Sequence, residues 1–290
     1  MTTTEPSTPT PSTASAGLAP LELPTRSTRA ASTAAFGALL LRDLVVLRKN
    51  LREFIPRTIL QPLLLVFVFT YVFPKIGQGV GGATGASEFS TLLVAGVIGL
   101  AVLFQGIQAV ALPMVTEFGV TREIEDRVLA PLPVSLVAIE KIVSGAIQGL
   151  FAALIVFPIA AIVPATPVHL KIHWVILLTF TPLACIMCSA LGLMFGTVFN
   201  PRTVPMLFGV VVLPITFLGC IYYTWASLAP IRWLQITILV NPLVYVSEGF
   251  RAALTDVPTM SLWAVYPVVI GFTVLFGAIG IRFFRRRVIA

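Results

Sequence analysis

The sequence predicts an all-α integral membrane protein with six transmembrane helices, and three observations support this fold class. Hydrophobic residues make up 57% of the 290 residues and charged residues only 11%, whereas a soluble domain has roughly 25% charged residues. The apolar residues are grouped into six long segments, and the mean hydropathy is +0.98. Lys and Arg gather in alternate connections between these segments, which is typical of a polytopic membrane protein.

Residues 1–32 come first and are rich in Thr, Ser, Pro and Ala. Because they lack the apolar content that offsets the entropy lost on ordering, we predict a disordered cytoplasmic tail. No apolar core follows a charged start, so the pattern is not that of a secretory signal. Residues 33–290 are predicted to form one domain that contains the six spans.

Residues 36–52 are predicted to form an amphipathic helix that lies in the membrane interface. Its apolar residues recur at helical spacing and are Phe36, Leu39, Leu40, Leu44, Leu47 and Leu51. Its polar side carries Arg42, Asp43, Arg48, Lys49 and Arg52. The alternative is a helix packed on a soluble domain, which the rest of the sequence does not provide.

The six predicted spans follow, each close to the length of about 20 residues that crosses a bilayer. They are residues 56–73, 90–115, 136–163, 174–199, 204–223 and 263–284. Proline residues lie within or at the ends of several spans, so kinks are expected. These prolines are Pro62, Pro113, Pro158, Pro182 and Pro214.

Polar and small residues inside the spans have two interpretations. The glutamines can hydrogen-bond between helices or line a polar path, and they are Gln61, Gln105, Gln108 and Gln148. The spacings Gly145/Gly149 and Gly192/Gly196 favour close helix approach. Cys185 and Cys188 lie in an apolar run and are interpreted as small buried residues. His169 and His173 lack further ligands nearby, so no metal site is predicted.

The distribution of basic residues predicts the orientation. If the amino terminus is cytoplasmic, 15 of the 19 Lys and Arg residues lie inside, and only Lys75, Lys171, Arg232 and Arg251 lie outside. Both termini are therefore predicted to be cytoplasmic. The net charge of +7 comes from residues that flank spans, so no nucleic-acid partner is predicted.

Residues 117–133, between the second and third spans, contain six ionisable groups. These are Glu117, Arg122, Glu123, Glu125, Asp126 and Arg127. Charges cost several kcal/mol in hydrocarbon, so this segment is predicted to be a short cytoplasmic helix that binds a soluble partner.

Residues 231–254 are too polar for a lipid-facing span. Asn241 and Pro242 are predicted to break this segment into a re-entrant or interfacial helical pair. Glu248 and Arg251 are three residues apart, so they can pair on one helix face.

The sequence lacks the motifs of an energy source or of a metalloprotease. No G-x-x-x-x-G-K-[ST] and no H-E-x-x-H occurs, so the chain does not bind ATP through a P-loop. A passive channel would not need the charged inner segment, whereas a transport subunit driven by a separate ATPase would.

These features resemble the type-2 ABC exporter permeases, a group that includes daunorubicin-resistance-type drug exporters, nodulation-factor exporters, and O-antigen and teichoic acid permeases. The resemblance covers residue 36 to the carboxyl end. It rests on the interfacial helix, on the charged loop with its Pro residues followed by Glu140 and Lys141, and on the Asn241-Pro242 break before the last span.

The resemblance implies a dimer, with a second copy or a related permease, bound to two ABC nucleotide-binding ATPase subunits. Residues 117–130 would be the coupling helix in a cleft of the ATPase. ATP and Mg²⁺ would bind to that partner, so no cofactor is expected in this chain, and the chain itself would not be an enzyme. The resemblance also implies transport from the cytoplasmic side outward.

The substrate is predicted only by class. Apolar and small residues line most of the spans, which favours a hydrophobic or amphiphilic cargo such as a drug, lipid or glycolipid. The alternatives are a polysaccharide or teichoic-acid-type exporter, a membrane-embedded lipid-modifying enzyme that uses Glu248, and a channel or scaffold. The excess of Arg over Lys and the frequent Ala favour the cytoplasmic membrane of a high-GC bacterium.

Overall fold

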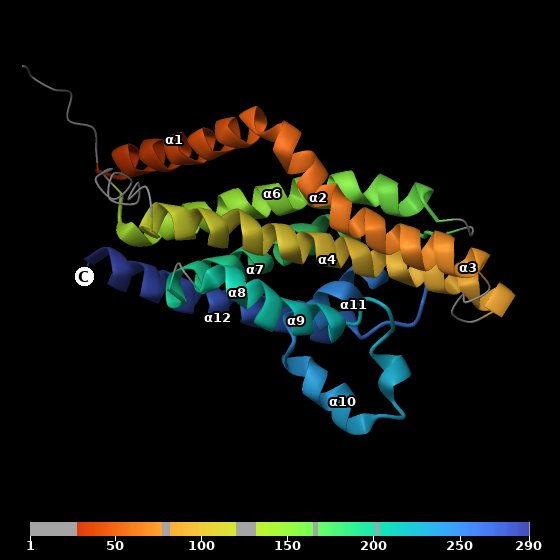
Figure 1. The fold of residues 1–290 in the computed structure, drawn as a ribbon. Helices are drawn as coiled ribbons and strands as arrows, with labels where there is room; N and C mark the ends of the chain where they lie inside the picture. The colour runs from red at the N-terminus through yellow and green to blue at the C-terminus, as the bar shows by residue number, and fades with distance from the viewer. Residues whose placement is uncertain (1–27, 77–81, 120–131, 165–167, 201–202, 290) are drawn as a thin grey trace, which may run out of the picture.

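The structure is a computed structural model and describes residues 28–76, 82–119, 132–164, 168–200 and 203–289. Within these ranges the chain forms helices and no strands, which confirms the all-α fold class. Figure 1 shows the long helices lying alongside one another in a bundle, with α1 on its outside and a small lobe that contains α10 projecting from one side.

The helices differ widely in length. The longer helices are α1 Thr28–Lys49, α2 Leu51–Val66, α4 Gly82–Gly119, α6 Val134–Ile162, α7 Trp174–Val198, α11 Pro242–Leu254 and α12 Leu262–Ile289. The short helices are α3 Phe73–Lys75, α8 Val204–Leu207, α9 Leu213–Phe217 and α10 Arg232–Thr237. The π-helical turns Phe67–Val72 and Phe208–Val212 join α2 to α3 and α8 to α9, and 3-10 turns at Ala226–Leu228 and Ile238–Val240 flank α10.

Six helical segments in the described part of the chain are long and apolar enough to cross a membrane. They are Arg29–Lys49, Leu51–Lys75, Ser87–Gly119, Val134–Ala160, Trp174–Val198 and Leu262–Val288. Six spans were also predicted, but the segment Arg29–Lys49 stands in place of the predicted span 204–223. The segment Arg29–Lys49 qualifies by length and composition, so the interfacial position of α1 stays a prediction.

The predicted fifth span, residues 204–223, is wrong in its length. Continuous helical turns run only from Val204 to Phe217, and the chain then bends. Cys220 has a φ of 54°, in the left-handed region that non-glycine residues rarely adopt. A helix cannot continue through that backbone conformation.

The centre of the bundle is the contact between α4 and α7, which glycines bring close together. A Cβ atom on Gly106 of α4 would lie 2.6 Å from the Cβ of Cys188, and one on Gly192 of α7 would lie 2.8 Å from the carbonyl oxygen of Gly106. Gly196 similarly faces Met114, and Gly145 of α6 faces Val110. The close helix approach predicted from the glycine spacings is therefore confirmed.

Replacing Gly192 with Leu is expected to lower the stability of the purified protein by about 1–3 kcal/mol or more, because the added side chain must push α4 and α7 apart. Gly271→Leu is the matched control, since Gly271 on α12 is exposed and a Cβ atom there meets nothing within 4 Å. The measurement is the thermal unfolding midpoint in detergent. Equal midpoints for the two variants would mean that α4 and α7 are not in close contact at Gly192.

The break at Asn241 and Pro242 is confirmed, and α11 begins there. The Oδ1 of Asn241 accepts a hydrogen bond from the backbone N–H of Leu243 at 2.9 Å, which caps the helix. Its amide nitrogen donates to the carbonyl oxygen of Ile215 at 2.7 Å. Figure 1 shows α10 outside the bundle and α11 within it, and nearly all of the α11 side chains are buried.

Candidate functional site

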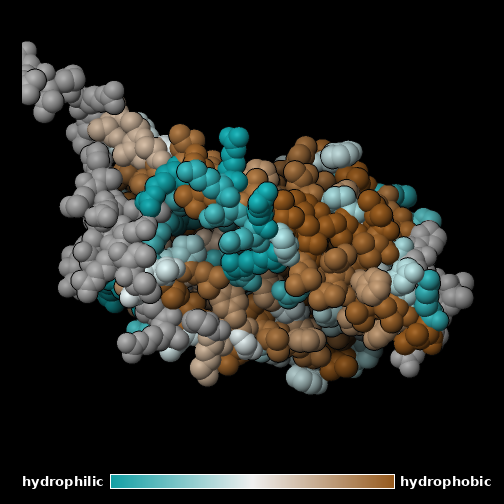
Figure 2. All heavy atoms as spheres, turned by 45° about the horizontal axis from the view of Figure 1, so that its top comes forward, coloured by the Kyte–Doolittle hydropathy of each residue, from teal (hydrophilic) through white to brown (hydrophobic). Residues whose placement is uncertain are grey.

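A polar cleft of about 600 Å³ lies where α1, α2, α4 and α6 meet. Figure 2 shows hydrophilic side chains gathered near the middle of this face of the molecule, with apolar surface beside them. Three of the four predicted intramembrane glutamines, Gln105, Gln108 and Gln148, line the cleft. Gln61 lines a smaller groove that adjoins it along α2 and α4.

The inner part of the cleft is a chain of amide and hydroxyl contacts. The hydroxyl of Thr58 donates to Gln105 Oε1 at 3.2 Å, and the amide nitrogen of Gln105 lies 3.5 Å from Gln148 Oε1. Arg57 donates two hydrogen bonds, from Nε at 2.9 Å and Nη2 at 2.5 Å, to Gln108 Oε1. These glutamines therefore both join α2, α4 and α6 and present polar groups to the cleft.

A charge cluster at the same cleft joins three helices. The ammonium group of Lys141 on α6 lies 2.7 Å from a Glu117 oxygen on α4 and 3.3 Å from an Asp43 oxygen on α1. The side chains of Lys141, Glu117 and Asp43 are 4%, 8% and 15% exposed. Lys141 is thus neutralised by two carboxylates and holds α1 against the ends of α4 and α6.

The structure describes only one of the six residues that were predicted to couple the chain to a partner. Glu117 is the first of them and pairs with Lys141. The remaining five, Arg122, Glu123, Glu125, Asp126 and Arg127, lie outside the described residues, so the coupling helix stays a prediction. Of the basic residues predicted for the interfacial helix, Arg42 lines the cleft, while Arg48, Lys49 and Arg52 do not line it.

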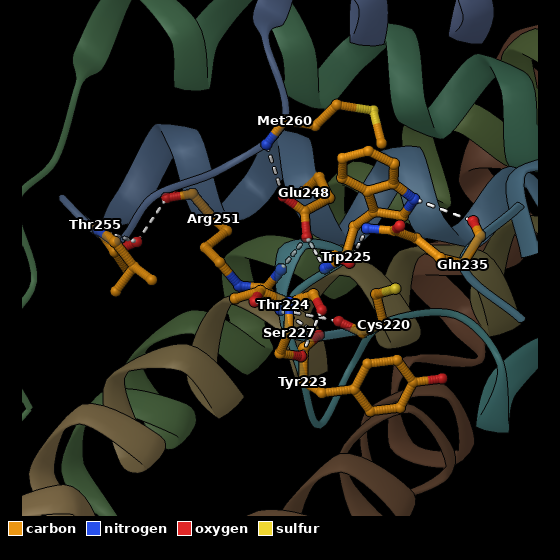
Figure 3. A network of polar contacts seen from close by, with 11 residues as sticks. Cys220, Tyr223, Thr224, Trp225, Ser227, Gln235, Glu248, Arg251, Thr255 and Met260 are labelled. Atoms are coloured by element: carbon orange, nitrogen blue, oxygen red, sulfur yellow. Dashed lines mark hydrogen bonds and ion pairs between the residues drawn. The ribbon is translucent and has the colours of Figure 1, made fainter. Parts of the chain in front are cut away.

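A second polar network surrounds the Glu248–Arg251 pair (Figure 3). Arg251 Nη1 donates to Glu248 Oε1 at 2.7 Å, and their side chains are 0% and 1% exposed. Glu248 also accepts the backbone N–H groups of Trp225 and Met260, both at 2.9 Å. Arg251 Nη2 donates to the carbonyl oxygen of Cys220 at 2.8 Å.

This network fixes irregular backbone. Both carboxylate oxygens of Glu248 are engaged and nearly inaccessible, so the side chain is placed to hold the 220–225 and 255–260 segments rather than to protonate a lipid. Trp225 and Gln235 strengthen the same region, since the indole N–H of Trp225 donates to the Gln235 carbonyl at 3.1 Å and the Gln235 amide donates to the Trp225 carbonyl at 3.2 Å.

The two histidines lie in the connection before α7. His173 Nε2 is 3.3 Å from Asp256 Oδ1, and Lys171 pairs with the other Asp256 oxygen. The hydrogen bond from Lys171 holds the pKa of Asp256 below its ordinary value. Among the described residues, no group of three His, Cys, Asp or Glu side chains is arranged to hold a metal ion.

One important cleft residue, Arg57, was not singled out from the sequence, and Lys141 was named only for its place after the charged loop. Lys141 lies within the predicted third span, and an ionisable residue inside a span is itself a pointer to a functional position. Arg57 lies at the start of the predicted first span and was counted only as a flanking basic residue. Their partners Asp43, on α1, and Gln108, on α4, are 98 and 51 residues away in the sequence.

Comparison with known proteins gives an independent finding. The model of the family described as "ABC-2 type transporter" matches residues 34–255. The chain is 27% identical over 226 residues to the "Inner membrane transport permease YadH" of Escherichia coli K12, a match that covers 76% of this chain and 84% of that relative. The protein of the same name from Shigella flexneri matches with the same identity and coverage.

Proposed function

The chain belongs to the ABC-2 type transporter family, and from this premise we propose that it is the permease subunit of an ATP-driven exporter. It is a multi-pass membrane protein and a transport permease subunit. The proposal adds that it works as a dimer with a second permease, that a separate ABC ATPase drives it, and that it moves a hydrophobic or amphiphilic substrate outward.

The family match over most of the chain is the observation that carries the proposal. The polar cleft supports it, because hydrogen-bonding side chains between membrane helices can line a substrate path. The cleft includes residues near the end of α4 and near the start of α6. Residues 120–131, which contain most of the predicted coupling helix 117–130, connect these two helices in the sequence.

The charge cluster offers a physical route from an ATPase to the cleft. A displacement of the segment between α4 and α6 would act on Glu117 and Lys141, which lie close to its two ends, and through them on Asp43 of α1. ATP can drive such a change only if it binds one arrangement of the complex more tightly than the other. We therefore propose that α1 moves with the coupling segment and changes the opening of the cleft.

Neutralising the predicted coupling helix tests the ATPase partnership. The triple variant Glu123→Gln, Glu125→Gln and Asp126→Asn is expected to lose the ATPase that copurifies with the wild-type chain from its native membrane. The reason is that charge-assisted contacts to the ATPase would disappear. ATPase activity in the purified sample is the measurement.

Glu88→Gln serves as the control, because Glu88 is exposed and lies near the other end of α4. It should retain the ATPase. The proposal fails if the wild-type chain purifies under gentle conditions without any ATPase, or if the triple variant retains normal ATP-dependent transport.

A further inference from the structure

Arg57 is an exposed cation at the cleft that forms no ion pair within the described part of the protein. Lys141 has two carboxylate partners. Within the same described ranges, the hydrogen bonds of Arg57 go to the neutral amide oxygen of Gln108, and it forms no ion pair. Glu53, one turn earlier on α2, lines the same cleft but makes no ion pair with Arg57.

The Arg57 side chain is held in place by a residue of a neighbouring helix. An arginine near the end of a membrane helix ordinarily extends toward the headgroups and water. Here the guanidinium group is exposed but is also bonded to α4, where Gln108 Oε1 accepts from both Nε and Nη2. A guanidinium group has five N–H donors, so three remain for another acceptor. Its planar fork suits the paired oxygens of phosphate and carboxylate groups.

The cleft at Arg57 is lined by both polar and apolar side chains. It lines the polar cleft together with Gln105 and Gln148. The apolar side chains of Val46, Leu47 and Leu112 line other parts of the same cleft. A cleft with both kinds of lining suits an amphiphile.

We propose that Arg57, positioned by Gln108, binds the anionic oxygen headgroup of an amphiphilic substrate in this cleft, with the apolar chain against the apolar residues that line the same cleft. This inference rests on the proposed function, because it treats the bound amphiphile as the transported substrate. The binding itself requires no ATPase and can be tested separately.

The test titrates the purified chain in dodecyl maltoside with dodecyl phosphate and follows the melting temperature. Dodecyl phosphate is expected to stabilise the wild-type chain, whereas inorganic phosphate at the same concentrations is not, because it lacks the apolar chain. Arg57→Gln is expected to raise the dodecyl phosphate concentration for half-maximal stabilisation about tenfold or more, as charge-assisted hydrogen bonds are lost.

Two further variants sharpen the result. Gln108→Glu is expected to weaken binding as much as Arg57→Gln does, because the new carboxylate neutralises Arg57 although the arginine is still present. Arg52→Gln is the matched control, since Arg52 is exposed on the same helix but does not line the cleft, and it should bind as the wild type does.

Three outcomes would overturn the inference. Unchanged binding in Arg57→Gln and Gln108→Glu would exclude the arginine as the headgroup site. An equal loss in Arg52→Gln would indicate a general surface-charge effect, and equal stabilisation by inorganic phosphate would indicate a free-anion site. Each of these leaves the permease proposal intact, because that proposal is decided by the copurified ATPase.

Discussion

Replacing Glu248 with Ala is expected to destabilise the folded chain by about 3–5 kcal/mol, a large effect for a single substitution. The variant leaves Arg251, which is completely buried, without its carboxylate, and removing one partner of a buried ion pair costs about that much. It also removes the acceptor of the Trp225 and Met260 backbone N–H groups. The measurement is unfolding of the purified protein by heat or by denaturing detergent.

A double variant separates two causes of the expected destabilisation, the unpaired charge of Arg251 and the lost backbone hydrogen bonds of Glu248. Glu248→Ala combined with Arg251→Met removes the unpaired charge and should recover part of the lost stability. Full recovery is not expected, since the carbonyl oxygen of Cys220 also loses its donor. Glu88→Ala, at an exposed position, should unfold as the wild type does. A Glu248→Ala variant with wild-type stability would contradict the polar network around α11.

Replacing Lys141 with Met is expected to cost about 3 kcal/mol or more, because the Glu117 and Asp43 carboxylates would lose the cation that they share. The effect should be seen in the unfolding midpoint and in protease sensitivity of α1, since this cluster holds α1 to the bundle. Lys49→Met, at an exposed position on α1, is the control and should change neither.

The Lys141 prediction also has a rescue. Adding Glu117→Gln to Lys141→Met removes one of the two carboxylates and should restore a substantial part of the stability, because a neutral amide needs no cation nearby. If the double variant were less stable than Lys141→Met alone, the destabilisation would come from lost packing of the lysine stem and not from charge.

Much of the fold could be predicted from the sequence because lipid imposes a simple requirement. Every backbone polar group in hydrocarbon must be satisfied, so long apolar segments become helices. The breaks could be predicted where a local signal exists. At Asn241, for example, the side-chain oxygen accepts the backbone N–H of Leu243 and caps the start of α11. Likewise, the glycine spacings on α6 and α7 predicted close approach.

The fifth span was predicted too long for a physical reason that hydropathy cannot reveal. Residues 218–223 are apolar enough to continue a helix, but Arg251 binds the carbonyl oxygen of Cys220 and Glu248 accepts the N–H of Trp225. These partners are 31 and 23 residues away in the sequence. Tertiary contacts, not local preference, determine where that helix ends.

The candidate site was only partly predictable for the same reason. The glutamines could be singled out because polar side chains are conspicuous within apolar spans. Their gathering around one cleft could not, since it depends on how α2, α4 and α6 pack. The partners of the charged residues could not be predicted either. Asp43 and Glu117 pair with Lys141 from two other helices, whereas Arg57 hydrogen-bonds to the neutral amide of Gln108.

The short helical run Val204–Phe217 has a consequence for the bilayer itself. At about 1.5 Å per residue it is about 20 Å long, while the hydrocarbon core is about 30 Å thick. Its residues Met206, Val210, Leu213 and Phe217 are all more than half exposed and follow one stripe. Where lipid covers this stripe, the hydrophobic mismatch should thin the adjacent leaflets. Headgroups and water would then reach deeper there than elsewhere around the protein.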